Sequence, residues 1–364
     1  MRFDFKEEWN QYKLKELLTV KSSGISINQM EENSGEYPLY GASGFIKNID
    51  FCEMESDYIS IVKDGSGVGN LSYHEKNSSI VNTSQYLLPK KNFDIHFLYY
   101  QLQTLNLLKY VNGSSIPHIY FKDYCIEKVA VPSLPEQQKI SNYLLLIDNK
   151  IELLEKKHHE YQNFKKYLMQ QIFAQKLRFN FSDEWDYLNF SNIFKSVSTK
   201  KYQIKSAEIM DNGDFEVIDQ GQDEIAGFFN DKNKLCYELP IIIYGDHTTF
   251  VKFRDKPFIV GADGVKLLLP KINANLKYLF YALEYFNIKP EGYKRHFSII
   301  KKINLPLPSL EEQNEISKVF SSVDKKLECI QIQLQETKKF KKSLLQQMFV
   351  VQLILSLLQN KKHI

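Results

Sequence analysis

Three short patterns in this sequence contain residue types that could support catalysis or ligand binding. Residues 65–69 (GSGVG) resemble a phosphate-binding loop, in which backbone amides hold phosphate where a helix begins. Residues 70–74 instead resemble a strand, so a hairpin turn is the better interpretation. The D-x-K fragments at 148–150 and 324–326 match part of some nuclease sites, but both lie inside predicted long helices. Solvated helix flanks explain them better.

Histidines and cysteines do not form a metal-binding pattern. His118, His247 and His296 are isolated, and each is interpreted as a hydrogen-bonded loop residue. The four cysteines, at positions 52, 125, 236 and 329, include no C-x-x-C pair, which argues against a zinc site or a disulfide framework. An NPPY-type methyltransferase motif, a Walker loop and an H-E-x-x-H motif are all missing from the sequence. We therefore predict no catalytic residues, no metal and no cofactor bound by this chain.

Length and composition indicate a folded protein of more than one domain. The chain has 364 residues, of which 25% are charged and 43% hydrophobic. Its N-terminus has no apolar signal-peptide core, and the apolar run at 350–358 is too short to span a bilayer. We expect a soluble cytoplasmic protein. The net charge of +3 permits nucleic-acid binding without requiring it.

The sequence is a tandem duplication with a period of 176 residues. Residues 131–173 align without a gap onto 307–349, with 18 identities in 43 positions. The same offset aligns residues 2–9 with 178–185 and pairs Trp9 with Trp185. The segments between these anchors diverge. The chain therefore alternates between variable and similar segments.

The similar segments predict two long helices. S-x-x-E sequences beginning at Ser133 and Ser309 have the spacing of a capping box. After each cap, residues recur at alternating steps of four and three over about five heptads, which is typical of a coiled coil about 60 Å long. Lys165 and Lys341 interrupt the two stripes at equivalent positions. They either fix the register of the paired helices or belong to an outward docking surface formed by the F-K-K sequences.

The variable segments are predicted to be mixed α/β. Strand-like runs occur at 58–62, 80–81, 86–88, 241–244, 257–260 and 265–269, and amphipathic helices at 97–108 and 276–286. Pairing of the long helices with each other in antiparallel orientation would relate the halves by a pseudo-two-fold axis. The predicted fold class is α+β, with two pseudo-symmetric mixed α/β domains separated by two long antiparallel coiled-coil helices.

This arrangement resembles the specificity subunit of type I restriction–modification enzymes. The resemblance covers essentially the whole chain and includes both P-S-L-x-E-Q helix starts. It also includes the phrases YPLYGASGFI (37–46), KDGSGVGN (63–70), SSIPHI (114–119), FEVIDQG (215–221), YGDHT (244–248) and VGADGVKLL (260–268). The implied domains are a first target recognition domain at 1–133, a first helix at 134–177, a second recognition domain at 178–306 and a second helix at 307–364.

The resemblance implies a non-catalytic, DNA-reading subunit that takes part in bacterial defence. Each recognition domain would read one half of a split, asymmetric DNA site with an unread spacer. The helices would dock two methyltransferase subunits, and two translocase/nuclease subunits could join them. S-adenosylmethionine, ATP and Mg2+ would be bound by those partner subunits and not by this chain. The alternative, from another functional class, is a coiled-coil protein–protein scaffold that reads no DNA.

Polar loop residues are the candidates for DNA contact, because paired hydrogen bonds to base edges require such side chains. Residues 1–133 carry 13 basic and 16 acidic side chains, so any DNA-facing surface there must be a local patch. In the first domain the candidates are Lys63, Ser66, Asn82, Ser84, Asn112, Ser114, Ser115 and His118. In the second domain they are Gln220, Gln222, His247, Thr248, Arg254, Lys266, Lys294, Arg295 and His296.

Overall fold

The computed structural model describes residues 8–261, 263–292 and 294–350. It divides into two compact units, residues 1–155 with 332–364 (unit 1) and residues 156–331 (unit 2). Most of the predicted repeat segment 2–9 and of the apolar run at 350–358 lies outside the described residues. No helix in the described part of the chain is long and apolar enough to cross a membrane.

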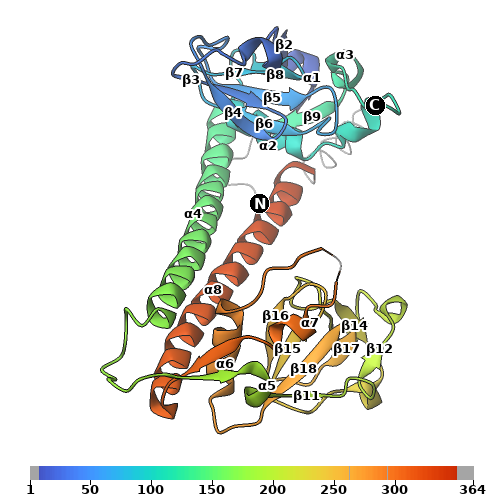
Figure 1. Ribbon diagram of the computed structural model, residues 1–364. Coiled ribbons are helices and arrows are strands. Elements are labelled where there is room, and N and C mark those ends of the chain that lie inside the picture. The colour runs from blue at the N-terminus through green and yellow to red at the C-terminus, as the bar shows by residue number, and fades with distance from the viewer. Residues whose placement is uncertain (1–7, 262, 293, 351–364) are drawn as a thin grey trace. The chain divides into compact units, whose positions relative to one another are not determined.

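The described residues of unit 1 form three small sheets, and a short helix packs against the largest of them (Figure 1). The largest sheet has the antiparallel order β2-β8-β5-β6, beside a sheet β4-β3-β7 and a pair β1-β9. Helix α2 packs on β5, β6 and β8. The bounds are β1 Asn10–Lys13, α1 Leu14–Leu17, β2 Leu18–Ser22, η1 Ile27–Met30, β3 Tyr37–Gly41, β4 Gly44–Ile49, β5 Tyr58–Val62, β6 Leu71–His74, β7 Ser79–Ile80, β8 Ser84–Pro89, α2 Ile95–Gln103, η2 Leu107–Tyr110, α3 Phe121–Tyr124 and β9 Lys128–Val131.

Unit 2 repeats this architecture. The sheet β11-β18-β15-β16 corresponds strand by strand to β2-β8-β5-β6, and β12-β17-β13-β14 and β10-β19 complete the unit. Helix α6 packs on β15 and β16. The bounds are β10 Asp186–Asn189, α5 Phe190–Ile193, β11 Phe194–Val197, β12 Gln203–Ile204, η3 Ser206–Glu208, β13 Phe215–Ile218, β14 Gly227–Phe229, η4 Lys232–Lys234, β15 Ile241–Gly245, β16 Val251–Arg254, β17 Ile259–Gly261, β18 Val265–Pro270, α6 Leu276–Tyr285, α7 Phe297–Ile300 and β19 Asn304–Leu307.

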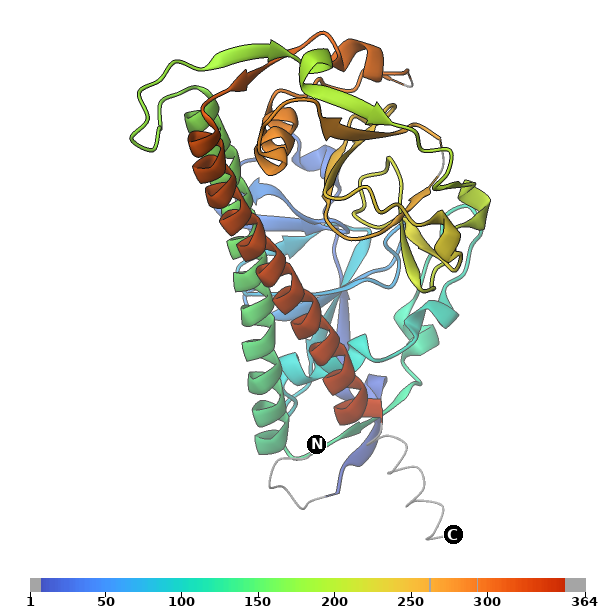
Figure 2. The same cartoon turned by 90° about the horizontal axis from the view of Figure 1, so that it is seen from below.

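The two predicted long helices are present as α4 (Leu134–Phe173) and α8 (Leu310–Leu345), and α8 continues into a π-helical turn at Gln346–Val350. Each is unbroken in Figure 2, with α4 in green and α8 in red-orange. Every residue of the two predicted heptad stripes is buried or half-buried. The sequence-based helix and seam predictions are therefore confirmed.

Segments of the two helices pair in antiparallel orientation within each unit. In unit 1 the start of α4, including Leu144 and Ile147, shares a core with Leu344 at the end of α8 and with Met348 in the π-helical turn that follows. In unit 2 the end of α4, including Leu168 and Ile172, shares a core with residues near the start of α8. The early part of one helix thus always meets the late part of the other, as the pseudo-two-fold duplication predicts.

Lys165 and Lys341 turn inward and form equivalent ion pairs. Lys165 lies 2.9 Å from Asp324 and 3.2 Å from Glu284 in unit 2. Lys341 lies 2.5 Å from Asp148 in unit 1. Burial lowers the pKa of Lys165, but Glu284 and Asp324 outweigh this penalty and leave its pKa raised. Each lysine thus has a specific carboxylate on the other helix, which supports the register interpretation.

The P-S-L-x-E-Q sequence anchors each globular part to a long helix. Trp9 Nε1 donates to the buried Glu136 carboxylate at 3.2 Å, and Trp185 Nε1 donates to Glu312 at 2.9 Å. The predicted cap is seen at Ser309, whose hydroxyl accepts from the Glu312 amide at 3.3 Å. The glutamates therefore have a long-range role that the capping pattern alone does not predict, because their indole partners lie 127 residues away.

The glycine-rich segment at 65–69 is a hairpin connection, as predicted. It joins the antiparallel strands β5 and β6, and Val62 donates its amide to the carbonyl of Asn70 at 2.9 Å. Gly65 and Gly69 have φ angles of 93° and 85°, a conformation that favours glycine. The glycines are therefore explained by the turn.

Candidate nucleic-acid interface

Three loops of unit 1 meet beyond the end of β5, and we call residues 63–70, 82–83 and 112–119 the unit 1 loop cluster. The Lys63 amide donates to the Thr83 carbonyl at 2.9 Å, and the Gly65 amide donates to the Pro117 carbonyl at 2.9 Å. The Ile119 amide donates to the Lys63 carbonyl, also at 2.9 Å. Backbone hydrogen bonds therefore hold together three loops that are distant in sequence.

Most of the predicted unit 1 contact residues lie on this cluster. Ser66, Asn82, Asn112, Ser114 and Ser115 are exposed. Lys63 and His118 are half-buried, with Lys63 Nζ 3.3 Å from Asp64 and His118 Nδ1 3.3 Å from the Ile116 carbonyl. The structure thus gathers seven of the eight candidates on one set of loops.

Unit 2 has a corresponding set of loops beyond β15, and we call residues 219–224, 246–250, 263–264 and 294–297 the unit 2 loop cluster. The Asp246 amide donates to the Gly264 carbonyl at 2.7 Å, which matches the Lys63–Thr83 bond of unit 1. The His296 amide donates to the Asp246 carbonyl at 2.7 Å. The duplicated scaffold therefore presents loops at equivalent strand ends in both units.

Gln220 connects three loops of the unit 2 cluster. Its Oε1 accepts from the His247 amide at 3.0 Å, and its Nε2 donates to the Asp263 carbonyl at 3.1 Å. The Thr248 hydroxyl donates to the Gln220 carbonyl. Gln222, Lys294 and Arg295 are exposed around this centre.

Two lysines of neighbouring strands contact the unit 2 loop cluster, Lys252 from β16 and Lys266 from β18. Lys252 is buried, and its Nζ donates to the Asp219 carbonyl at 3.1 Å and to the Asp223 carbonyl at 2.5 Å. Burial lowers the pKa of Lys252, while the nearby Asp219 opposes the shift. Lys266 lies 3.5 Å from Asp246. These two lysines hold the loops in place, and the exposed cations of the cluster are Lys294 and Arg295.

Three predicted contact residues are covered by, or paired with, other parts of the protein. His296 is fully buried, with its Nδ1 3.1 Å from the Asp246 carbonyl and its Nε2 accepting from the Glu291 amide at 3.0 Å. Ser84 is also buried, at 2% exposure. The Arg254 side chain is 12% exposed and lies 3.3 Å from Glu216. Their interpretation as base-contacting residues is corrected, because surrounding protein atoms cover or pair their polar groups.

Sequence reasoning missed Asp219, Asp246, Asp263 and Lys252, which organise the unit 2 cluster. The three aspartates lie in polar phrases after buried strands, but the sequence does not show that these phrases meet. Lys252 lies in the middle of β16 (VKFR), where alternation alone suggests a solvent-facing lysine. Its carbonyl partners are 29 and 33 residues away in sequence. Only the folded structure identifies it.

Comparison with known proteins gives consistent matches along the chain. Residues 6–162 and 182–339 each match the family described as type I restriction modification DNA specificity domain. A type I restriction enzyme specificity subunit, MjaVIII, from Methanocaldococcus jannaschii is 24% identical, with 93% of this chain and 91% of that protein covered. A putative type I specificity subunit from Mycoplasma pneumoniae is 23% identical, covering 84% and 86% of the two chains.

A solved structure shows the same fold. The crystal structure of a type I restriction-modification system S subunit from M. genitalium superposes with a TM-score of 0.71 at 18% sequence identity. The match covers 96% of this chain and 98% of the other. The mixed helix and strand content and the long helices are thus features of a known architecture.

Proposed function

This chain belongs to the family of type I restriction modification DNA specificity domains, of which it contains two copies, and on that premise we propose that it reads a bipartite DNA sequence for a modification enzyme. The observation that carries the proposal is the pair of loop clusters at equivalent strand ends. The scaffolds match strand by strand, whereas the loop sequences differ. Two different readers would recognise an asymmetric site whose halves are separated by unread base pairs.

The exposed residues of the clusters suit direct readout. Asparagine and glutamine form paired hydrogen bonds with adenine, and arginine does so with guanine. Asn82 and Asn112 in unit 1, and Gln222 and Arg295 in unit 2, are exposed side chains of these types. Backbone hydrogen bonds beneath them restrict loop movement, so less conformational entropy is lost on binding.

The long helices are proposed to dock the catalytic partners. Phe164 and Phe340 occupy equivalent positions and are 47% and 50% exposed, whereas the lysines that follow them turn inward. Exposed aromatic side chains are enriched at protein interfaces. We propose that each helix docks one methyltransferase subunit, which brings S-adenosylmethionine, and that nuclease subunits bring ATP and Mg2+.

The docking role has a direct test. Phe164→Ser should weaken co-purification of the methyltransferase, whereas Gln162→Ser, an exposed change on the same helical turn, should leave it intact. Equal recovery of the methyltransferase with both variants would show that Phe164 is not part of the docking surface.

Methylome sequencing tests the DNA-reading role. The chain is expressed with its methyltransferase in a host free of other adenine methylation, and methylated positions are mapped across the genome. We expect one split, asymmetric motif. Replacing residues 1–133 with those of another family member should change one half of the motif and preserve the other. A catalytically competent complex that methylates no defined motif would contradict the proposal and support the scaffold alternative.

A further inference from the structure

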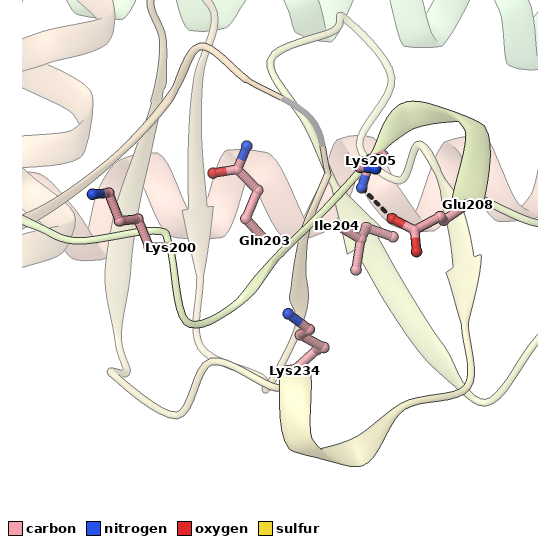
Figure 3. A pocket seen from close by; sticks show the side chains of 6 residues that line it. All are labelled: Lys200, Gln203, Ile204, Lys205, Glu208 and Lys234. Atoms are coloured by element: carbon pink, nitrogen blue, oxygen red, sulfur yellow. Dashed lines mark hydrogen bonds between the residues drawn. The ribbon is translucent and has the colours of Figure 1, made fainter.

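A hollow of about 350 Å3 lies on unit 2 beside the loop cluster, and Figure 3 shows the side chains that line it. Its lining comes from the segment before β12, from β12 and η3, and from the end of η4. The residues are Lys200, Gln203, Ile204, Lys205, Glu208 and Lys234. Two segments, 200–208 and the end of η4, therefore place three lysines around one hollow.

The lysines of the hollow differ from other lysines of unit 2 in that they form no salt bridge among the described residues. Among the described residues, no salt bridge is formed by Lys200, Lys205 or Lys234, although other unit 2 lysines form several. The single carboxylate of the lining, Glu208, accepts a hydrogen bond from the Lys205 backbone amide at 2.7 Å. The hollow thus has three lysines against one carboxylate, which makes its lining net positive.

A short hydrogen-bonded path joins the hollow to the proposed base-reading loops. Gln203 Nε2 donates to Asp263 Oδ1 at 2.7 Å, and the Asp263 carbonyl accepts from Gln220 Nε2 at 3.1 Å. A duplex held against the loop cluster would therefore bring its backbone near the hollow. Phosphates are the groups that lysines contact there, and such contacts position the duplex without reading bases.

Unit 1 has no lysines in the corresponding segment. Strands β2 and β11 are related by the 176-residue offset, and the residues after them differ in charge. Residues 199–208 include Lys200, Lys201 and Lys205, whereas residues 23–32 (SGISINQMEE) contain no basic residue. The lysines that the first segment brings to the hollow are therefore specific to the second half of the duplication.

We infer that the hollow lined by Lys200, Lys205 and Lys234 binds phosphates of duplex DNA and gives unit 2 a larger share of the non-specific binding affinity than unit 1. The inference rests on the proposed DNA-reading function and adds to it the surface that contacts the backbone. Bases are read by the loop clusters, whereas the hollow contributes affinity that falls as salt rises.

The test measures DNA binding as a function of salt. The complete complex with its methyltransferase is titrated, by fluorescence anisotropy, into a labelled 30-base-pair duplex that contains the methylated motif, at KCl concentrations from 50 to 200 mM. The slope of log K against log salt is negative, and each lost phosphate contact reduces its magnitude by about 0.9. For the variant K200A/K205A/K234A we expect a slope smaller in magnitude by about 2.7, so the affinity lost across this salt range shrinks by about 40-fold. The methylated motif should stay unchanged.

Two matched variants make the outcome specific. K176A/K256A/K302A removes the same charge from exposed positions of unit 2 outside the hollow, and should have a smaller effect. K200R/K205R/K234R should retain the wild-type slope. If the alanine variant keeps the wild-type slope, or if both alanine variants lose slope equally, the hollow is not the phosphate site. If the wild-type complex binds no DNA, the proposed function itself fails.

Discussion

Replacing Lys165 tests whether its ion pair sets the register of the long helices. The Lys165→Met change keeps the apolar stem but leaves Asp324 and Glu284 without their cation. Breaking a fully buried pair costs about 3–5 kcal/mol, whereas exposed pairs contribute about 0–1 kcal/mol. The side chains of Lys165 and Asp324 are 15% and 32% exposed, between these limits. We therefore expect the free energy of unfolding of unit 2 to fall by about 2 kcal/mol.

The two tryptophans provide separate reporters for this measurement. The chain has two, Trp9 in unit 1 and Trp185 in unit 2, and both are buried. In a Trp9→Phe background, urea unfolding followed by Trp185 fluorescence reports on unit 2. Lys166→Met, an exposed neighbouring change, serves as the control and should alter stability by less than about 0.5 kcal/mol.

A double-mutant cycle identifies the ion pair as the cause. Asp324→Asn keeps an oxygen that can accept the Tyr281 hydroxyl hydrogen bond, which spans 2.6 Å in the wild type. Combined with Lys165→Met, it should cost about 1–2 kcal/mol less than the sum of the single changes, because each single change already removes the Lys165–Asp324 pair and the second change cannot remove it again. Additive effects, or an effect of Lys165→Met no larger than that of Lys166→Met, would refute the register explanation.

Three further predictions concern the recognition units. Burial lowers the pKa of His74 to about 4 from its ordinary value of 6.5, so below pH 6.5 the unfolded chain binds a proton that the folded chain does not. Between pH 7.5 and 5 the free energy of unfolding of the wild type should therefore fall by about 2 kcal/mol more than that of His74→Gln. Urea unfolding followed by Trp9 fluorescence measures both, and parallel pH profiles of the two proteins would contradict the prediction. Lys252→Met removes the hydrogen bonds that hold the 219–224 loop, so it should weaken binding to the motif about tenfold and relax selectivity at one half-site only. A competition assay that shows unchanged selectivity at both half-sites would contradict this role. Asn82→Ala should relax the motif at one position of the other half-site, seen by methylome sequencing, and an unaltered motif would show that Asn82 contacts no base.

Short-range sequence patterns were enough to predict the helices and turns, whose residues lie close together in the chain. The heptad stripes predicted α4 and α8, and the turn residues at 65–69 predicted the hairpin between β5 and β6. The 176-residue duplication predicted that the two halves share one architecture. Such features follow from sequence because helix and strand faces repeat at fixed short intervals.

The tertiary structure alone decided which distant polar groups meet. It paired the Trp9 indole with Glu136, turned Lys165 toward Asp324, buried His296, and brought Gln203 beside Asp263 at the edge of a lysine-lined hollow. These partners are separated by up to 159 residues, and no local pattern specifies them. The physical reason is that a hydrogen bond or an ion pair depends on the distance and angle between two groups, which the packing of the whole unit sets.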